Sequence, residues 1–250
     1  MEKIEFKNKI LGVHNHTNSN LYEPELDDLW FLYRLIKDKC VTSILEYGSG
    51  WSTYAMGIAL HENFLDFGLE HTQTIRHPNP FKLMTIDASN KYQEIAMNRI
   101  SDEVKKNILP IKSTPVLTTL DGAICHKFEL IPNFAPDLIY LDGPDHNQVM
   151  GNLEGFEYNE SFTQPMGCDL LMIEPFLWPE TILVTDGRTA NARFLASRFK
   201  RDWQIMHDPF GDRTMFRLNE SPLGLISEEH INFRLAKSRE LISKEKPQRN

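Results

Sequence analysis

The stretch from Ser43 to Thr53 constrains the fold more than any other part of the chain, because it joins a β-prone run to a glycine turn. It reads Ser-Ile-Leu-Glu-Tyr-Gly-Ser-Gly-Trp-Ser-Thr, and the apolar run Tyr54 to Leu60 that follows predicts a helix. A strand, a tight turn and a helix in this order gather backbone N–H groups and a helix N-terminus around one point, where a nucleotide-like ligand can bind. The stretch therefore predicts an α/β fold with its functional site at this turn.

The residues of the turn have separate tasks. Gly48 and Gly50 permit positive φ and close approach of a ligand, and Ser52 or Thr53 can cap the helix. Glu46 places a carboxylate at the entrance of the turn, where a pyrophosphate would be repelled. Thr53 also stands where the dinucleotide-binding fingerprint G-x-G-x-x-G has its last glycine. An NAD-dependent oxidoreductase is therefore the weaker alternative.

The turn resembles motif I, E/D-x-G-x-G, of class I S-adenosylmethionine-dependent methyltransferases, in the variant E-x-G-S-G-x-S-T. In that family the glycine turn packs against the methionine part of the cofactor, and an acid ending the second strand holds the ribose hydroxyls. The run from Lys82 to Asp87 provides such a strand and acid. The resemblance implies a Rossmann-like fold: a mostly parallel seven-stranded sheet with helices on both faces and an antiparallel last strand.

A second apolar run, Pro136 to Leu141, ends in Asp142-Gly143-Pro144 and is typical of a central parallel strand that opens into a cleft. It resembles motif IV of the same family, where an acid at the end of the fourth strand lies beside the transferred methyl group. The two resemblances together imply a cofactor site made of Glu46, Gly48, Ser49, Gly50, Ser52, Thr53, Asp87 and Asp142.

His146 is the candidate general base, with Asp142 or Asp145 to orient it. A hydroxyl that accepts a methyl group must lose its proton, and an imidazole that titrates near neutral pH suits this task. The alternative is a histidine that only caps or fills a loop. Arg188, just after the strand Thr181 to Asp186, is the third candidate catalytic residue, because its guanidinium could fork onto an acidic acceptor.

Asp142 and Asp186 leave a metal site open. Some small-molecule O-methyltransferases bind Mg²⁺ through an Asp at each of these places, and the resemblance implies these two ligands. Gly187, however, stands where the third ligand is expected. Mg²⁺ usually keeps several waters, so this departure leaves Mg²⁺ as an optional cofactor beside S-adenosylmethionine.

The chain is expected to form one domain over residues 1–250, with an N-terminal arm and helix (1–39), an α/β core (40–218) and a C-terminal helix and tail (219–250). Within the arm, residues 1–24 are polar and turn-prone and predict irregular structure, and residues 25–37 predict an amphipathic helix. Residues 61–80 are expected to be an insertion that covers the cofactor or the acceptor. Asp121-Gly122 predicts a hairpin turn between two β-prone runs.

Composition narrows the partners and the compartment. The formal net charge of −8 argues against nucleic acid, whose phosphates need clustered Lys and Arg. No apolar run approaches the roughly 20 residues that span a bilayer, and the N-terminus lacks a signal-peptide core, so we expect a cytoplasmic protein without membrane contact. The three cysteines are far apart, which favours buried reduced thiols. Self-association of the chain is left open.

The sequence thus predicts an S-adenosylmethionine-dependent methyltransferase that acts on a small molecule, with O-methyl transfer favoured. The Asp-Gly-Pro run and the run Asp-Gly-Arg-Thr-Ala-Asn-Ala-Arg-Phe-Leu resemble methyltransferase-like proteins associated with bacterial surface polysaccharides. This resemblance implies polysaccharide biosynthesis, with a sugar or nucleotide-sugar hydroxyl as acceptor. The principal alternative is a degenerate module that binds a nucleotide without turnover.

Overall fold

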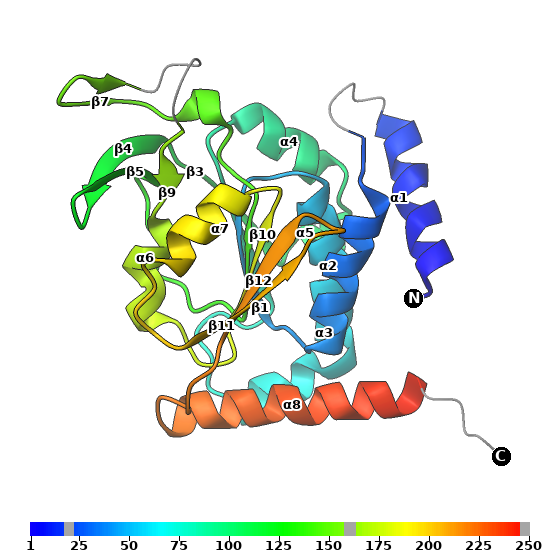
Figure 1. Cartoon of the computed structure of the whole chain (residues 1–250). Coiled ribbons are helices and arrows are strands. Elements are labelled where there is room, and N and C mark those ends of the chain that lie inside the picture. Colours follow the sequence, from blue (N-terminus) through cyan, green and yellow to red (C-terminus); the bar gives the residue numbers. More distant parts are fainter. Residues whose placement is uncertain (18–22, 158–163, 246–250) are drawn as a thin grey trace.

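A seven-stranded sheet forms the centre of the molecule, which is known from a computed structural model that describes residues 1–17, 23–157 and 164–245. The strand order is β11-β12-β10-β6-β1-β2-β3, and β12 alone runs antiparallel to its neighbours (Figure 1). This confirms the Rossmann-like methyltransferase fold and its antiparallel last strand. The strands are β1 (Ser43–Tyr47), β2 (Lys82–Asp87), β3 (Ile108–Lys112), β6 (Leu138–Leu141), β10 (Ile182–Asp186), β11 (Trp203–Asp208) and β12 (Arg213–Leu218).

Helices cover both faces of the sheet, as Figure 1 shows for α2 and α3 on one side and α7 on the other. The central strands are apolar along their whole length because alternate residues enter opposite cores: Ile44 packs into one cluster and Leu45 into the other. The helices are α1 (Lys3–Thr17), α2 (Leu26–Asp38), α3 (Trp51–Thr74), α4 (Asn90–Asn98), α5 (Asp102–Lys105), α6 (Asp169–Ile173), α7 (Thr189–Ala196) and α8 (Leu225–Glu245). None of the described helices is long and apolar enough to span a membrane.

Much of the segment expected to be an irregular arm, residues 1–24, is the helix α1. Phe6 and Ile10 are fully buried, and the Phe6 ring lies 5.4 Å from that of Trp30 and 4.8 Å from that of Tyr33. Because most residues of the arm are polar, secondary-structure propensities alone do not reveal this short apolar stripe. Packing against α2 stabilises the helix, as it does for most protein helices.

The expected insertion at residues 61–80 is also mostly helical, because α3 continues to Thr74 without a break. Its far end places His71 beside His230 and near Asp137, at the amino ends of the strands, so this part of the segment does not lie over the glycine turn. The hairpin predicted at Asp121-Gly122 is present between β4 (Pro115–Leu120) and β5 (Ala123–Phe128), and both turn residues have positive φ, 49° and 78°. The short strand β9 (Met166–Gly167) pairs with β5.

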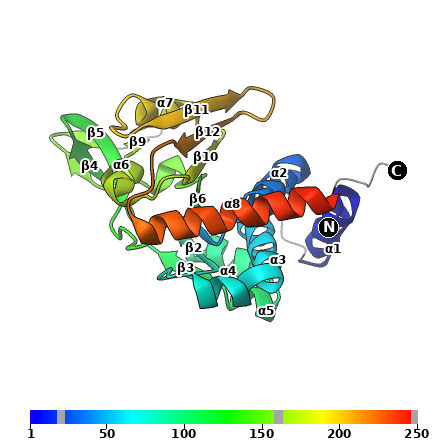
Figure 2. The same ribbon diagram turned by 90° about the horizontal axis from the view of Figure 1, so that it is seen from below.

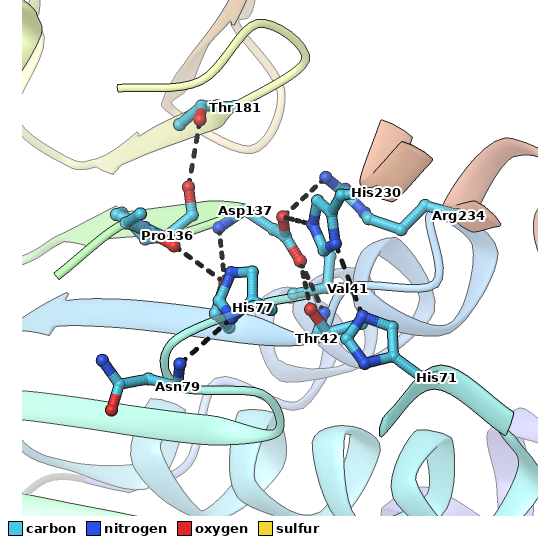
Figure 3. Close-up of polar contacts among 12 residues, drawn as sticks. Val41, Thr42, His71, His77, Asn79, Pro136, Asp137, Thr181, His230 and Arg234 are labelled. Atoms are coloured by element: carbon cyan, nitrogen blue, oxygen red, sulfur yellow. Dashed lines mark hydrogen bonds and ion pairs between the residues drawn. The ribbon is translucent and has the colours of Figure 1, made fainter. Parts of the chain in front are cut away.

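A buried polar cluster attaches α8 to the amino ends of the strands. Figure 2 shows α8 crossing in front of β6, and Figure 3 shows Asp137 between α8 and the start of β1. Asp137 accepts hydrogen bonds from His230 Nε2 (2.7 Å), Arg234 Nη1 (2.8 Å), and the backbone N–H (2.7 Å) and hydroxyl (2.9 Å) of Thr42. Burial alone would raise the pKa of Asp137, but the charges of Arg234 and His230 outweigh it and hold the pKa well below its usual range.

Two further histidines complete this polar cluster. His71 Nε2 lies 3.4 Å from His230 Nδ1, and the His77 ring centre lies 4.9 Å from that of His230 (Figure 3). Burial lowers the pKa of both His71 and His77 to about 4, so both are neutral at pH 7. A buried anion that is paired and fully hydrogen-bonded in this way holds the C-terminal helix in one position.

We predict that Asp137→Asn destabilises the protein by about 3–5 kcal/mol, because it leaves the buried guanidinium of Arg234 without its counter-charge. Urea unfolding followed by circular dichroism measures this loss. Asp102→Asn is the control, since Asp102 is 95% exposed and its ion pair with Lys105 adds little. A loss for Asp137→Asn no larger than that of the control would show that the cluster does not hold α8.

Candidate active site

A pocket of about 450 Å³ lies at the carboxyl ends of the parallel strands. It is lined by the β1–α3 turn, by residues that end or follow β2, β6 and β10, and by the start of α2. The chain runs from β1 outward to β3 and then crosses back to β6, so β1 and β6 meet where the direction of winding reverses. Open α/β sheets bind ligands at this place, and the volume suits a small organic molecule.

The floor of the pocket is a backbone contact between the two motifs found in the sequence. Gly48 has a φ of +97°, and a Cβ on it would lie 2.9 Å from Gly143 N. A Cβ on Gly143 would lie 2.7 Å from Gly48 Cα, which is closer than any side chain tolerates. Tyr47 O accepts hydrogen bonds from Asp142 N (3.0 Å) and Gly143 N (2.6 Å). Both glycines are required here, and the contact fixes Asp142 beside the turn.

Asp87 ends β2 and lines the pocket next to the turn, as the sequence places it. Its carboxylate accepts the backbone N–H of Ser49 (2.7 Å) and of Ser89 (2.6 Å). Burial raises the pKa of Asp87 above its ordinary value, and these two hydrogen bonds offset only part of that rise. Because a carboxylate can accept roughly four hydrogen bonds, Asp87 can support the turn and still bind ligand hydroxyls.

Glu46 and Thr53 lie beneath the turn and, unlike the other expected cofactor residues, do not line the pocket. Glu46 is fully buried and accepts hydrogen bonds from the hydroxyls of Ser52 (2.6 Å) and Thr53 (2.7 Å). Thr53 Oγ1 in turn accepts the backbone N–H of Gly50 (3.0 Å). Burial raises the pKa of Glu46 to about 8, against the lowering effect of these hydroxyls. In this structure both residues brace the turn and the start of α3, which differs from the expected contact with the cofactor.

Asp142 follows β6 and Asp186 ends the adjacent strand β10, and both line the pocket. Arg188, two residues after Asp186, also lines it and contacts the loop that follows β6. The Asp142 side chain is 55% exposed, and the Arg188 Nε atom lies 4.0 Å from its Oδ1 atom. The surrounding protein raises the pKa of Asp142 to about 7; the Arg188 charge lowers it, and Asp186 raises it further. Asp186 accepts a hydrogen bond of 2.6 Å from the Tyr140 hydroxyl. Arg188 Nη2 donates to the carbonyls of Asp142 and Pro144, so this nitrogen serves the loop rather than an acidic acceptor.

His146 begins the short 3-10 helix η1 (His146–Gln148), directly after the pocket residue Asp145. Its side chain lies outside the part of the chain that the structure describes. Its role as general base therefore stays a prediction.

Other pocket residues carry no motif that a sequence reading could find. Glu25 and Asp28, at the start of α2, face the strand ends, and Trp51 lies at the start of α3 with the Arg99 guanidinium 4.0 Å from its ring centre. Helical spacing predicts α2 but does not say which end of the sheet it meets. Their position is a consequence of tertiary packing.

The residues do not fit a metal centre. Across residues 1–17, 23–157 and 164–245, no group of three or more His, Cys, Asp or Glu side chains could hold a metal ion. Asp142 and Asp186 both line the pocket, but Gly187, with a φ of +58°, stands where a third ligand was expected. The Mg²⁺ site considered from the sequence is not supported.

We predict that the stability difference between the wild type and Glu46→Gln depends on pH. The folded protein keeps the Glu46 proton up to about pH 8, whereas an ordinary carboxyl releases it near 4.5. This contribution is complete below about pH 4.5 and is lost as the pH rises towards 8, so the advantage of the wild type should shrink by up to about 5 kcal/mol over that range. Chemical unfolding at several pH values measures it. Replacing the exposed Glu94 in Glu94→Gln is the control, and its stability difference from the wild type should not change over this pH range. A difference for Glu46→Gln that is just as independent of pH would contradict the prediction.

No protein-family model matches the chain, and no curated protein matches it in sequence. Among solved structures it is similar to the O-methyltransferase TomG of Streptomyces achromogenes in complex with SAM (15% identity, 86% of this chain and 90% of that chain, TM-score 0.47). It is also similar to an O-methyltransferase of Bacillus cereus in complex with SAH (15%, 86% and 91%, 0.44) and to the SAH-bound methyltransferase PaMTH1 of Podospora anserina (14%, 85% and 88%, 0.48). With identities of 15% or lower and TM-scores of 0.48 or lower, these likenesses add nothing to the strand order, on which the fold assignment rests.

Proposed function

We propose that this chain is an S-adenosylmethionine-dependent methyltransferase that acts on a small molecule. One observation carries the proposal: the glycine turn, Asp87 and Asp142, which come from three different strands, line a single pocket. In this arrangement Gly48 to Ser52 receive the methionine part of the cofactor, and Asp87 receives the ribose hydroxyls.

Charge supports the same choice of cofactor. The carboxylates of Asp87, Asp142 and Asp186 line the pocket, and they attract a sulfonium cation and repel the pyrophosphate of a dinucleotide. When bound, the sulfonium group provides a methyl carbon open to attack by a nucleophile.

Asp142 is one candidate for the base that accepts the proton of the acceptor hydroxyl. Its pKa of about 7 lets it take up a proton at neutral pH. The charge of Arg188 lowers this pKa and so keeps a fraction of Asp142 in the carboxylate form. Asp142 would accept the proton that the acceptor hydroxyl loses when it takes up the methyl group. His146, four residues on and at the start of η1, is the second candidate. The acceptor class proposed from the sequence is a sugar or nucleotide-sugar hydroxyl.

We predict that S-adenosylhomocysteine (SAH) binds and raises the melting temperature, whereas NAD does not. Asp87→Ala should weaken SAH binding by about tenfold or more, because it removes the acceptor for two ribose hydroxyls. Thermal shift and titration calorimetry measure both effects. Ser89→Ala is the control, since Ser89 touches Asp87 only through its backbone N–H. Stabilisation by NAD instead of SAH would favour an oxidoreductase and contradict the proposal.

We predict that Asp142→Asn lowers kcat by about a hundredfold or more at neutral pH. The KM for S-adenosylmethionine should rise less than kcat falls, because Asp87 and Asp186 still attract the sulfonium group. The wild-type rate should fall as the pH drops below about 7, because Asp142 then holds its proton, and this fall should be absent in the variant. SAH release with a screened acceptor gives the rates. His146→Asn is the matched comparison: a loss in that variant with an unaffected Asp142→Asn would assign the base to His146. Binding of SAH without methyl transfer to any acceptor would favour a degenerate module.

A further inference from the structure

Carboxylates from distant parts of the chain line the pocket on the side away from Asp87. Glu25 and Asp28 come from the start of α2, and Asp186 ends β10, which the order of the sheet separates from β2 by β6 and β1. These groups interact: a hydrogen bond with Asp28 and burial raise the pKa of Glu25, and the charges of Asp28 and Asp186 raise it further. With the cofactor on the turn and Asp87, over β1 and β2, as proposed, this acidic wall of Glu25, Asp28 and Asp186 faces the space left for an acceptor.

Few positive charges offset the acidic wall. Among the described residues that line the pocket, seven are Asp or Glu and two are Arg. Arg188 serves the backbone of the β6 loop, and Arg99 stacks on Trp51 beside the turn. Asp28 pairs with Arg213 (2.7 Å), which does not line the pocket and also binds Asp208 (2.8 Å). The side of the pocket opposite Asp87 therefore keeps a negative balance.

The acidic wall suits an organic cation better than a metal ion. A divalent cation needs several oxygen ligands that converge on one point. No such group of three exists among the described side chains. An ammonium group has three N–H donors and can bind carboxylates that lie apart, forming charge-assisted hydrogen bonds with them.

We propose that the acidic wall selects an acceptor with an ammonium group near the methylated hydroxyl, such as an amino sugar, and rejects phosphorylated acceptors such as nucleotide sugars. This inference rests on the proposed methyltransferase function and narrows its acceptor class. The carboxylates of the wall would repel a phosphate in this space. An ammonium group loses hydrogen bonds to water on entry and replaces them with hydrogen bonds to Glu25 and Asp186.

The experiment compares acceptors that differ only in charge. Protein saturated with SAH is titrated by calorimetry with D-glucosamine and its neutral counterpart N-acetylglucosamine, with tyramine and N-acetyltyramine, and with UDP-N-acetylglucosamine. In at least one pair the ammonium compound should bind about tenfold tighter than its acetylated partner, and UDP-N-acetylglucosamine should bind weakest. Mass spectrometry of reactions with S-adenosylmethionine should show methylation of the ammonium compound.

Variants place the effect on the acidic wall. Glu25→Gln and Asp186→Asn should each weaken binding of the ammonium compound by about tenfold, and Glu25→Gln should leave binding of SAH unchanged. Asp27→Asn is the matched control: Asp27 adjoins Asp28 in the first turn of α2, but it pairs with Lys3 (2.8 Å) and Lys7 (2.9 Å) and does not line the pocket. This variant should bind every probe as the wild type does.

The outcomes separate the two proposals. Failure of SAH to bind overturns the methyltransferase function itself. If SAH binds, the cation inference is overturned when acetylated or nucleotide-sugar probes bind as well as the ammonium compounds, when no probe binds, or when Mg²⁺ is required for binding. Equal losses in Asp27→Asn and Glu25→Gln would likewise overturn it, because the effect would then reflect general charge and not the pocket wall.

Discussion

The contact between the backbones of Gly48 and Gly143 is the constraint on which the rest of the site depends. It brings the end of β1 and the end of β6 so close that neither residue can carry a side chain, and the Tyr47 carbonyl binds the chain on both sides of Asp142. Two segments separated by almost a hundred residues thereby become one rigid floor. Asp142 and the glycine turn then line the same pocket.

The two edges of the sheet use carboxylates in opposite ways. At the amino edge, Asp137 is paired with Arg234 and His230, and its low pKa reflects a charge that the fold has satisfied. At the carboxyl edge, Asp142 and Asp186 have raised pKa values because they are desolvated and lie near other acids. Satisfied charge stabilises a position of the chain, whereas unsatisfied charge is available to a ligand. The contrast places the attachment of α8 at the amino edge and the candidate binding site at the carboxyl edge.

Glu46 shows how a motif residue can act through its neighbours. Its carboxyl group is enclosed below the turn and binds the hydroxyls of Ser52 and Thr53, so it orients the start of α3 and, through Thr53, the N–H of Gly50. The pocket lies on the other side of the glycine turn from Glu46. A turn that must hold an unusual backbone shape in the absence of ligand needs such internal support.

The resemblance of this chain's motifs to a known family implied the antiparallel last strand and the place of Asp87 beside the turn. Local signals in the sequence determined the strands around Glu46 and Asp142 and the hairpin at Asp121-Gly122. These features follow from apolar runs, turn chemistry and chain order, which act over short distances. Tertiary structure alone decided that α1 folds against Trp30, that α3 extends to the polar cluster, that Glu46 points away from the pocket, and that α2 brings Glu25 and Asp28 over β10. The physical reason is that burial and charge proximity depend on which surfaces meet, and no spacing along the chain specifies that.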